Sequence, residues 1–154
     1  MNLRSTLRTR AEPSARGPET DCYVLGGGHL GVAVARRLHA AGHAVTLVAT
    51  DADADADDFR TLRGDPWAVD VLCDAGVTAT STVVVATPDD GRNLLVAQLV
   101  RTRFDVDDVF VVVHTPERFD LVAEAGHEPI CATTILADAV VDGLTPRLGE
   151  ADAA

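Results

Sequence analysis

From residue 21 onward, short and uniformly apolar runs alternate with longer stretches of helical periodicity. Four of the runs are rich in valine and show no polar alternation: residues 22–25, 44–49, 82–86 and 109–113. Strands buried on both faces have this composition, as in a parallel sheet that is covered by helices on both sides. Residues 59–62 mix apolar side chains with arginine and predict an edge strand, and residues 129–132 are a weaker sixth candidate.

The stretches between these runs predict five helices, at residues 29–41, 67–75, 93–103, 116–125 and 134–142. The first gathers its apolar side chains on one face, made of Leu30, Val34, Leu38 and Ala41. The third is apolar around most of its surface, which predicts deep burial or a dimer contact. Gly143, followed by Pro146, predicts the end of the last helix. The alternation predicts an α/β fold: a single Rossmann-like domain with a doubly wound parallel sheet and helices on both faces.

Three of the predicted helices follow a strand directly and begin with one pair of residue types. A polar side chain stands where the N-cap would be, and proline follows at the first helical position: Asp65-Pro66, Thr87-Pro88 and Thr115-Pro116. The carboxyl ends of parallel strands share one edge, so the positive ends of several helix dipoles are expected to gather there. Open α/β sheets bind ligands at this edge, where the strand order reverses.

The sharpest motif is the hexapeptide Gly26-Gly27-Gly28-His29-Leu30-Gly31, which has the pattern G-x-G-x-x-G. It follows the first apolar run and opens the first predicted helix, which is the setting of a dinucleotide-binding fingerprint. Gly26 would allow a tight turn, Gly28 would let the backbone approach a pyrophosphate, and Gly31 would let the helix pack on the strand. The free amides of the helix start would then hold the pyrophosphate.

The fingerprint also expects an acid at the end of the second strand, which here reads Val48-Ala49-Thr50-Asp51. The strand register places Ala49 at the expected position, whereas Asp51 has the expected separation from the glycines. Asp51 therefore either holds the ribose hydroxyls or only begins the acidic loop of residues 51–58. That acidic charge disfavours a 2′-phosphate, so NAD(H), with ADP or ATP as alternatives, is expected rather than NADP(H).

Composition narrows the classes of partner. The 154 residues carry 13 basic and 24 acidic side chains, for a formal net charge of -11, so a nucleic-acid-binding surface is not expected. No apolar run reaches the length of a bilayer span and no secretory signal is visible, which favours a cytoplasmic protein. All 13 basic residues are arginine and aspartate outnumbers glutamate by 18 to 6. This bias indicates either a salt-adapted cytoplasm or a genome of high GC content.

The remaining features predict organisation rather than chemistry. Residues 1–20 are expected to form a flexible tail, residues 21–146 the folded domain, and residues 147–154 a disordered end. The three cysteines stand apart in apolar stretches, which predicts core packing without a disulfide: Cys22, Cys73 and Cys131. The histidines lack metal-ligand spacing, so no metal site is expected. Trp67 is expected to anchor the core rather than to stack on a base.

Several blocks of sequence recur in the order and spacing of a known family. They are the loop 26–31, Gly64-Asp65-Pro66, residues 75–77, the segment 83–90 with Asn93, and Thr115-Pro116-Glu117. In these blocks the chain resembles the RCK N-terminal domain, also called TrkA-N or KTN, over residues 21–145. The resemblance implies a cytosolic nucleotide-binding module that regulates a membrane potassium transporter or channel. It also implies a homodimer or a larger ring, for which the helix 93–103 is the expected dimer surface.

The resemblance also implies the residues of the site. Gly26, Gly28, His29, Leu30 and Gly31 would cradle phosphates, Asp65 would lie near the adenine, and Ala86, Thr87 and Pro88 would line the cleft, with His114 at the rim. The sequence departs from the family at three positions: Ala49 replaces the usual ribose acid, Val112 a frequent arginine, and His114 a frequent Asn or Asp. A C-terminal ligand-binding domain, usual in the family, is not expected in this chain.

A second reading from the residues is an NAD-dependent oxidoreductase. Residues 24–28, 45–49 and 86–89 also resemble the N-terminal domain of the dehydrogenases of sirohaem synthesis. In that case the acid–base groups would be Asp89, Asp90 and His114. The helices after residue 90 and the Gly64-Asp65 pair favour the regulatory family.

Overall fold

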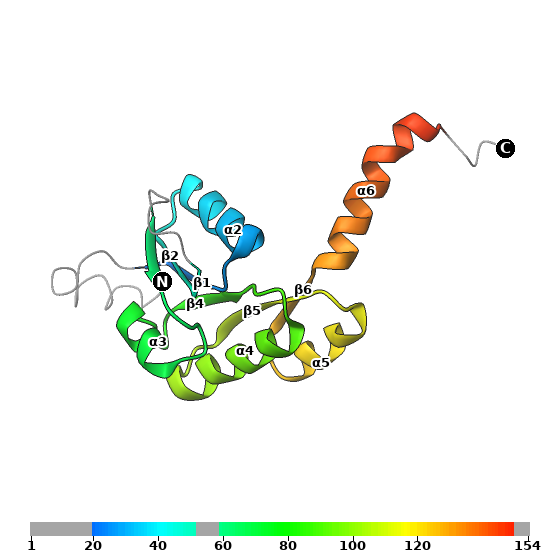
Figure 1. The fold of residues 1–154 in the computed structure, drawn as a ribbon. Helices are drawn as coiled ribbons and strands as arrows, with labels where there is room; N and C mark the ends of the chain where they lie inside the picture. Colours follow the sequence, from blue (N-terminus) through cyan, green and yellow to red (C-terminus); the bar gives the residue numbers. More distant parts are fainter. Residues whose placement is uncertain (1–19, 52–58, 150–154) are drawn as a thin grey trace, which may run out of the picture.

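The structure is a computed structural model that describes residues 20–51 and 59–149 (Figure 1). Three predicted segments lie wholly or mostly outside the described residues: the tail of residues 1–20 apart from Thr20, most of the acidic loop 51–58, and residues 150–154 of the predicted disordered end. Six parallel strands form one sheet in the order β3-β2-β1-β4-β5-β6. They are β1 (Cys22–Leu25), β2 (Val45–Ala49), β3 (Arg60–Arg63), β4 (Thr82–Val85), β5 (Asp108–Val113) and β6 (Glu128–Cys131). The doubly wound Rossmann-like sheet is confirmed, with β3 and β6 at its edges.

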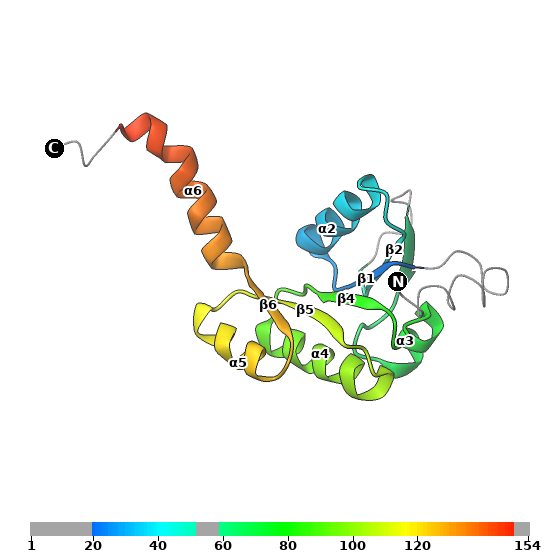
Figure 2. The ribbon, with the colours of Figure 1, turned by 180° about the vertical axis from the view of Figure 1, so that it is seen from behind.

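The helices cover the two faces of the sheet unequally. Helix α2 (Gly28–Ala40) lies alone on one face, and α3 (Val69–Ala75), α4 (Asp90–Phe104) and α5 (Phe119–Glu124) lie on the other (Figure 1). A short 3-10 turn, η2 (Pro116–Arg118), leads into α5. Helix α6 (Ala132–Leu148) projects away from the sheet in both views (Figure 2). Within residues 20–51 and 59–149, the half of the sheet made of β4, β5 and β6 therefore has helices on one face only.

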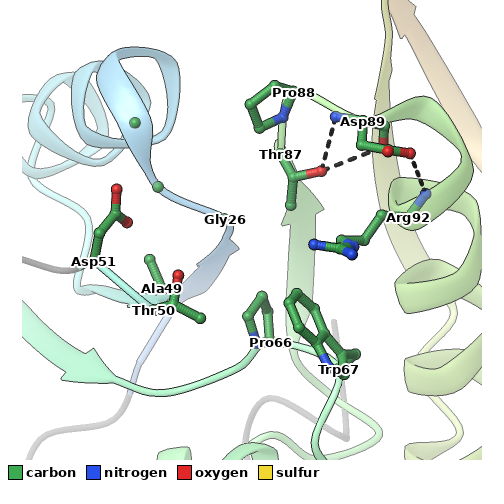
Figure 3. A pocket seen from close by; sticks show the side chains of 12 residues that line it. Gly26, Ala49, Thr50, Asp51, Pro66, Trp67, Thr87, Pro88, Asp89 and Arg92 are labelled. Atoms are coloured by element: carbon green, nitrogen blue, oxygen red, sulfur yellow. Dashed lines mark hydrogen bonds between the residues drawn. The ribbon is translucent and has the colours of Figure 1, made fainter.

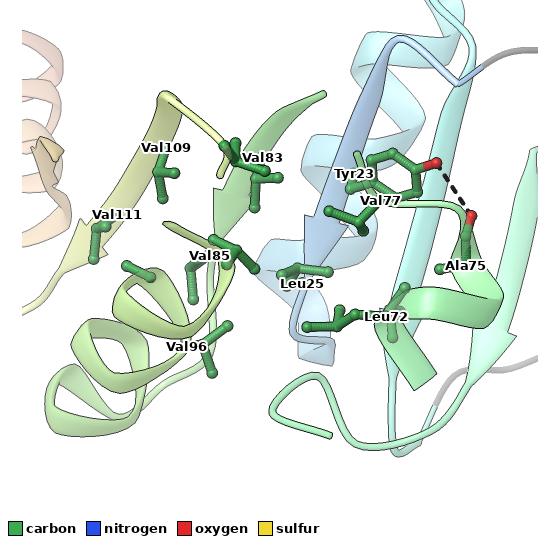
Figure 4. Close-up of a cluster of buried hydrophobic side chains, with 14 of the residues drawn as sticks. Tyr23, Leu25, Leu72, Ala75, Val77, Val83, Val85, Val96, Val109 and Val111 are labelled. Atoms are coloured by element: carbon green, nitrogen blue, oxygen red, sulfur yellow. Dashed lines mark hydrogen bonds between the residues drawn. The ribbon is translucent and has the colours of Figure 1, made fainter. Parts of the chain in front are cut away.

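The hydrophobic core forms two clusters, one on each face of the sheet. The larger cluster lies between the sheet and the helices α3, α4 and α5, and it includes Leu25, Leu72, Val85, Val96 and Val111 (Figure 4). A smaller cluster under α2 consists of Val24, Ala35, Val45 and Leu47. Uniformly apolar strands serve both clusters, because alternate side chains point to opposite faces of the sheet.

Buried polar contacts fix the end of α3 against the first strand. The hydroxyl of Tyr23 donates to the carbonyl of Ala75 over 3.1 Å (Figure 4). Arg60 on β3 donates to the same carbonyl through Nη1 over 2.8 Å. These two donors satisfy a carbonyl at the helix C-terminus, where the helix itself offers no partner.

The predicted starts of two helices are wrong. Helix α3 begins at Val69 with Ala68 as its N-cap, so Asp65-Pro66 belongs to a preceding turn. Helix α4 begins at Asp90, and the N-cap is Asp89 rather than Thr87: the Asp89 side chain accepts from the amide of Arg92 over 2.9 Å. Proline is favoured in turns as well as at first helical positions. A polar residue followed by proline therefore does not by itself distinguish a helix start from a turn.

Thr115-Pro116 does start a helical segment, although Thr115 makes no side-chain cap. The broadly apolar helix expected at residues 93–103 packs on its own sheet through Val96, Ala97 and Val100, while Leu95 stays 64% exposed. The dimer contact expected of this helix stays a prediction. Among the described residues, six of the twelve large apolar side chains that are exposed lie on α6.

The last helix extends past its predicted end. It begins at Ala132 and ends at Leu148, so Gly143 and Pro146 lie inside it. Glycine inside an exposed helix costs only about 1 kcal/mol relative to alanine. Pro146 removes a single amide near the end of the helix, and the hydroxyl of Thr145 donates to the carbonyl of Val141 over 2.7 Å. Arg147 and Leu148, predicted in a disordered end, are therefore helical.

Two predictions of burial are also corrected. Cys22 and Cys131 are buried as expected, but Cys73 is exposed on α3. The apolar face predicted for the first helix is confirmed at Val34 and Leu38, which pack against the cluster under α2, but Leu30 is 41% exposed. Gly31 and Ala35 are the residues that α2 buries. No helix within residues 20–51 and 59–149 is both long and apolar enough to cross a bilayer.

Candidate functional site

A cavity of about 290 Å³ opens at the carboxyl ends of four strands (Figure 3). It lies across the point where the strand order reverses, because β1 runs between β2 on one side and β4 on the other. Its lining comes from four loops that each follow a strand: Gly26, Gly27, Gly28, Ala49, Thr50, Asp51, Pro66, Trp67, Thr87, Pro88, Asp89 and Arg92. This is the place at which open α/β sheets bind their ligands.

The glycines of the loop are required for three separate reasons. Gly26 has a φ of +114°, and a Cβ there would lie 2.7 Å from Cγ2 of Thr87. Gly28 has a φ of +72° and open space where its Cβ would be, so a ligand can approach its backbone. A Cβ on Gly31 would lie 2.0 Å from the carbonyl oxygen of Gly26, so only glycine permits this contact between α2 and the loop. The tight turn predicted at Gly26 and the close packing predicted at Gly31 are confirmed, whereas the approach of a pyrophosphate to Gly28 stays a prediction.

The start of α2 has the features of an anion site. Its N-cap is Gly27, which offers no side chain to the first-turn amides, and the first turn contains no acidic residue. Helix N-termini carry a partial positive charge and point free N–H groups at a ligand. The loop therefore fits the diphosphate of a nucleotide: space at Gly28, uncapped amides and a positive helix end.

Both residues proposed for the ribose lie beside Gly27. A Cβ on Gly27 would lie 2.5 Å from Oδ1 of Asp51 and 2.9 Å from Cβ of Ala49. Ala49 is buried at the end of β2, and the exposed Asp51 points its carboxylate back along the cavity wall toward α2 (Figure 3). The Asp51 carboxylate and the Ala49 side chain therefore lie on the same side of the glycine loop.

The opposite wall is held by a buried asparagine. Asn93 is fully buried on α4, and its Oδ1 accepts from both the amide and the hydroxyl of Thr87. Its Nδ2 donates to the carbonyls of Thr87 and Val112, each over 2.9 Å. One side chain therefore joins β4, α4 and β5 and fixes the wall formed by Thr87 and Pro88. A buried network with every group paired makes such a wall rigid.

Asp90 ties α4 to the end of β5. Its carboxylate oxygens accept from the backbone amides of His114, over 2.7 Å, and Thr115, over 2.9 Å. Desolvation acts to raise the pKa of Asp90, but these hydrogen bonds outweigh it and leave the pKa below its ordinary value. Nε2 of His114 lies 3.3 Å from the carbonyl oxygen of Thr87. The two groups therefore serve the framework behind the cavity.

The floor of the cavity carries an aromatic–cation pair. Trp67 is 36% exposed in the turn before α3, and the guanidinium carbon of Arg92 lies 4.3 Å from its ring centroid. Figure 3 shows Arg92 between the indole and Thr87, directed into the cavity. Trp67 is thus a surface of the cavity, and the expectation that it anchors the core is wrong.

A comparison with models of protein families shows to which family the chain belongs. The model of the TrkA-N domain matches residues 22–141. The chain belongs to the TrkA-N domain family. The Trk system potassium uptake protein TrkA of Streptomyces coelicolor is 25% identical over 136 residues, covering 82% of this chain and 59% of that protein. The chain therefore spans about three fifths of that relative.

Solved structures share the TrkA-N fold. The Kef C-terminal domain of Shewanella denitrificans in its AMP-bound form is 18% identical, covers 84% of this chain and 81% of its own, and has a TM-score of 0.72. The GsuK channel bound to NAD is 22% identical, with 84% of this chain and 25% of that chain covered, and has a TM-score of 0.65. At these identities the likeness shows the fold alone.

Not every residue assigned to the TrkA-N site by sequence lies at the cavity. Eight of the fourteen do: Gly26, Gly27, Gly28, Ala49, Thr50, Asp51, Thr87 and Pro88. The other six are not among its lining residues: His29, Leu30, Gly31, Asp65, Ala86 and His114. Gly31 and Ala86 are buried behind the loop and beneath Thr87, and His29 is exposed on the first turn of α2.

Four lining residues were absent from the predicted nucleotide site, although Asp89 was a candidate acid–base group: Pro66, Trp67, Asp89 and Arg92. Pro66 and Trp67 stand in the loop after β3, as the glycines stand in the loop after β1. Their place after a predicted strand could therefore have marked them as candidates. Arg92 could have been found only with the correct start of α4, which places it in the first turn. Within the described residues, no cluster of histidine, cysteine and acidic side chains is arranged to hold a metal ion.

Proposed function

We propose that this TrkA-N domain is a cytoplasmic nucleotide-binding module that regulates a membrane potassium transporter or channel. The observation that carries the proposal is the cavity at the strand-order reversal, with an uncapped helix start and room at Gly28. NAD(H) is the expected ligand, and ADP or ATP is the alternative. Similarity to a potassium uptake protein supports the assignment to potassium transport.

The residues of the cavity divide the work of binding. The first-turn amides of α2 would receive the diphosphate, and the Asp51 carboxylate would accept from the ribose hydroxyls. The 2′-phosphate of NADP(H) would lie close to the Asp51 carboxylate and be repelled by its negative charge, so NAD(H) is favoured over NADP(H). Thr87, held by Asn93, would form the wall against which the nucleotide lies.

A binding module fits the site better than an oxidoreductase. Asp90 accepts two backbone hydrogen bonds, and Asp89 caps α4 by accepting from Arg92. His114 is not among the cavity-lining residues. The three groups that would supply acid–base chemistry are thus engaged in framework contacts, and no observation favours the dehydrogenase reading.

We further propose that the module is a homodimer in which α6 of each copy covers the other copy's open sheet face. Every residue of α6 from Thr133 to Leu148 is exposed. Its apolar side chains form a row at every fourth position, 47–74% exposed: Leu136, Val140, Leu144 and Leu148. Rows of this spacing pack into grooves of neighbouring elements.

The complementary surface is the face of β4, β5 and β6 that no described helix covers. Val84 and Phe110 are opposite each other in the register, and Ile130 pairs with Val112. Their neighbours Val83, Val85 and Val111 belong to the cluster under α4, so Val84 and Phe110 point to the open face. Parallel sheets are almost always covered on both faces. In the part of the chain that the structure describes, α6 lacks an apolar partner and this face lacks a covering helix, so each would cover the other in a second copy.

Thermal unfolding with added nucleotide tests the ligand proposal. A ligand present at about 100 times its Kd stabilises the folded state by about 2.7 kcal/mol. For a chain of this size that corresponds to a rise in Tm of roughly 5–10 °C. We expect this rise with NAD, NADH or ADP and a smaller one with NADP. Unchanged melting with every nucleotide at millimolar concentration would reject the proposal.

Asp51→Asn supplies the matched variant for ligand choice. Because it removes the charge that would repel a 2′-phosphate, the difference between NAD and NADP should shrink in this variant. An unchanged difference would show that Asp51 does not lie near the ribose. Gly143→Ala, far out on α6, is the control and should keep the nucleotide response of the unaltered chain.

A further inference from the structure

We propose that Arg92 is the cationic contact for the second phosphate of the bound nucleotide and that Trp67 is the residue that positions it. The cavity would then select a diphosphate over a monophosphate. This inference rests on the proposed nucleotide-binding function and assigns a part of the site that the glycine loop does not supply.

Among the described residues that line the cavity, Arg92 is the one with a basic side chain. Its backbone is fixed in the first turn of α4, where its amide donates to the Asp89 side chain. Figure 3 shows its side chain reaching into the cavity from the wall opposite α2. Among the described residues, no carboxylate forms an ion pair with its guanidinium. A charged planar group with five donors is therefore available to a ligand anion.

Trp67 holds that group in place. The guanidinium carbon lies 4.3 Å from the indole centroid, within the range of a cation–π contact. Pro66, buried beside it, fixes the backbone of the turn. Because the guanidinium covers the ring, the indole serves Arg92 rather than a nucleotide base. An arginine stacked in this way loses little further side-chain freedom when it binds a phosphate.

The charges of the cavity explain why the Arg92 contact would favour a nucleoside diphosphate over a monophosphate. Two carboxylates, Asp51 and Asp89, line the same cavity as Arg92. Each phosphate added to a ligand is repelled by both carboxylates, and only Arg92 and the amides of α2 offset that repulsion. The amides of α2 contact the diphosphate from the side of the glycine loop, and the second phosphate needs a positive charge from the opposite wall as well. The sign of the second phosphate's contribution to binding therefore depends on Arg92.

The test compares AMP with ADP by isothermal titration calorimetry in buffer containing EDTA. Charge-assisted hydrogen bonds to a phosphate are worth about one order of magnitude or more in affinity. We expect the unaltered chain to bind ADP about tenfold more tightly than AMP. Arg92→Gln should bind AMP as before and lose the preference for ADP, and Arg92→Lys should keep part of it. Arg103→Gln, at the other end of α4, is the matched control and should keep the full preference.

Two further variants test the positioning role. Trp67→Ala should reduce the ratio of ADP to AMP affinity about threefold without weakening AMP binding, and Trp67→Phe, which keeps an aromatic face, should restore it. An unchanged ratio in Arg92→Gln, with the unaltered chain still binding nucleotide, would overturn this inference and leave the proposed function standing. Equal affinities for AMP and ADP in the unaltered chain would overturn it too. Binding of neither nucleotide would reject the proposed function and this inference with it.

Discussion

Replacing Gly31 with alanine tests the packing of the glycine loop against α2. In the structure the added Cβ would lie 2.0 Å from the carbonyl oxygen of Gly26 and 3.0 Å from its carbon. Both atoms belong to the backbone, so the helix or the loop must move. Alanine gains about 1 kcal/mol of helix propensity over glycine, whereas forced overpacking costs about 1–3 kcal/mol. A clash this short lies at the upper end, so we expect a net loss of about 2 kcal/mol.

Urea unfolding followed by far-UV circular dichroism measures this loss directly. The control is Gly143→Ala, where the new Cβ meets no atom within 4 Å and α6 keeps helical geometry, so that variant should gain up to about 1 kcal/mol. Gly31→Ala should also lose its thermal response to NAD, because the Gly26 turn is displaced. A Gly31→Ala chain that is as stable as the Gly143→Ala chain would refute the close contact between α2 and the loop.

Three further changes follow from other parts of the molecule. Asn93→Leu should cost about 3 kcal/mol in urea unfolding, because it leaves buried groups of Thr87 unpaired; a loss below about 1 kcal/mol would argue against the network. Burial first, and then the charge of Arg101, lower the pKa of His127 below its ordinary 6.5. The unfolded chain therefore binds this proton at a higher pH than the folded chain, so stability is complete above about pH 6.5 and falls as the pH drops below it. His127→Phe should flatten that part of the stability–pH curve, and an unaltered slope would contradict this assignment. In light-scattering measurements, Leu144→Asp should halve the mass of the proposed dimer while Asp142→Asn leaves it unchanged; equal masses would remove α6 from the interface.

The sheet could be predicted from sequence because its strands are buried on both faces. Runs such as residues 82–86 and 109–113 have no polar alternation, and few structures other than a covered parallel sheet accommodate them. The glycine loop was equally predictable, since Gly26, Gly28 and Gly31 each answer a separate steric requirement in the observed backbone. Local constraints of this kind do not depend on what packs elsewhere.

The parts that failed depend on contacts distant in sequence. The start of α4 was misplaced because Thr87 and Asp89 can both cap a helix. In the structure the Thr87 hydroxyl instead donates to the buried Asn93 side chain, in the wall of the cavity. Trp67 was assigned to the core because a large aromatic residue is usually buried there. Its place at the cavity follows from the turn after β3 and from Arg92, which lies 25 residues further along the chain.

The central claim is that the amides of the glycine loop receive the diphosphate of a nucleotide. Labelling the chain with ¹⁵N-glycine reduces the amide NMR spectrum to its 12 glycines, and each loop signal can be assigned by substitution. On addition of NAD or ADP, the signals of Gly26, Gly27 and Gly28 should move, whereas those of Gly126 and Gly143 should stay; adenosine should move them far less. Nucleotide binding that leaves the loop signals in place, or that moves them equally with adenosine, would contradict the account.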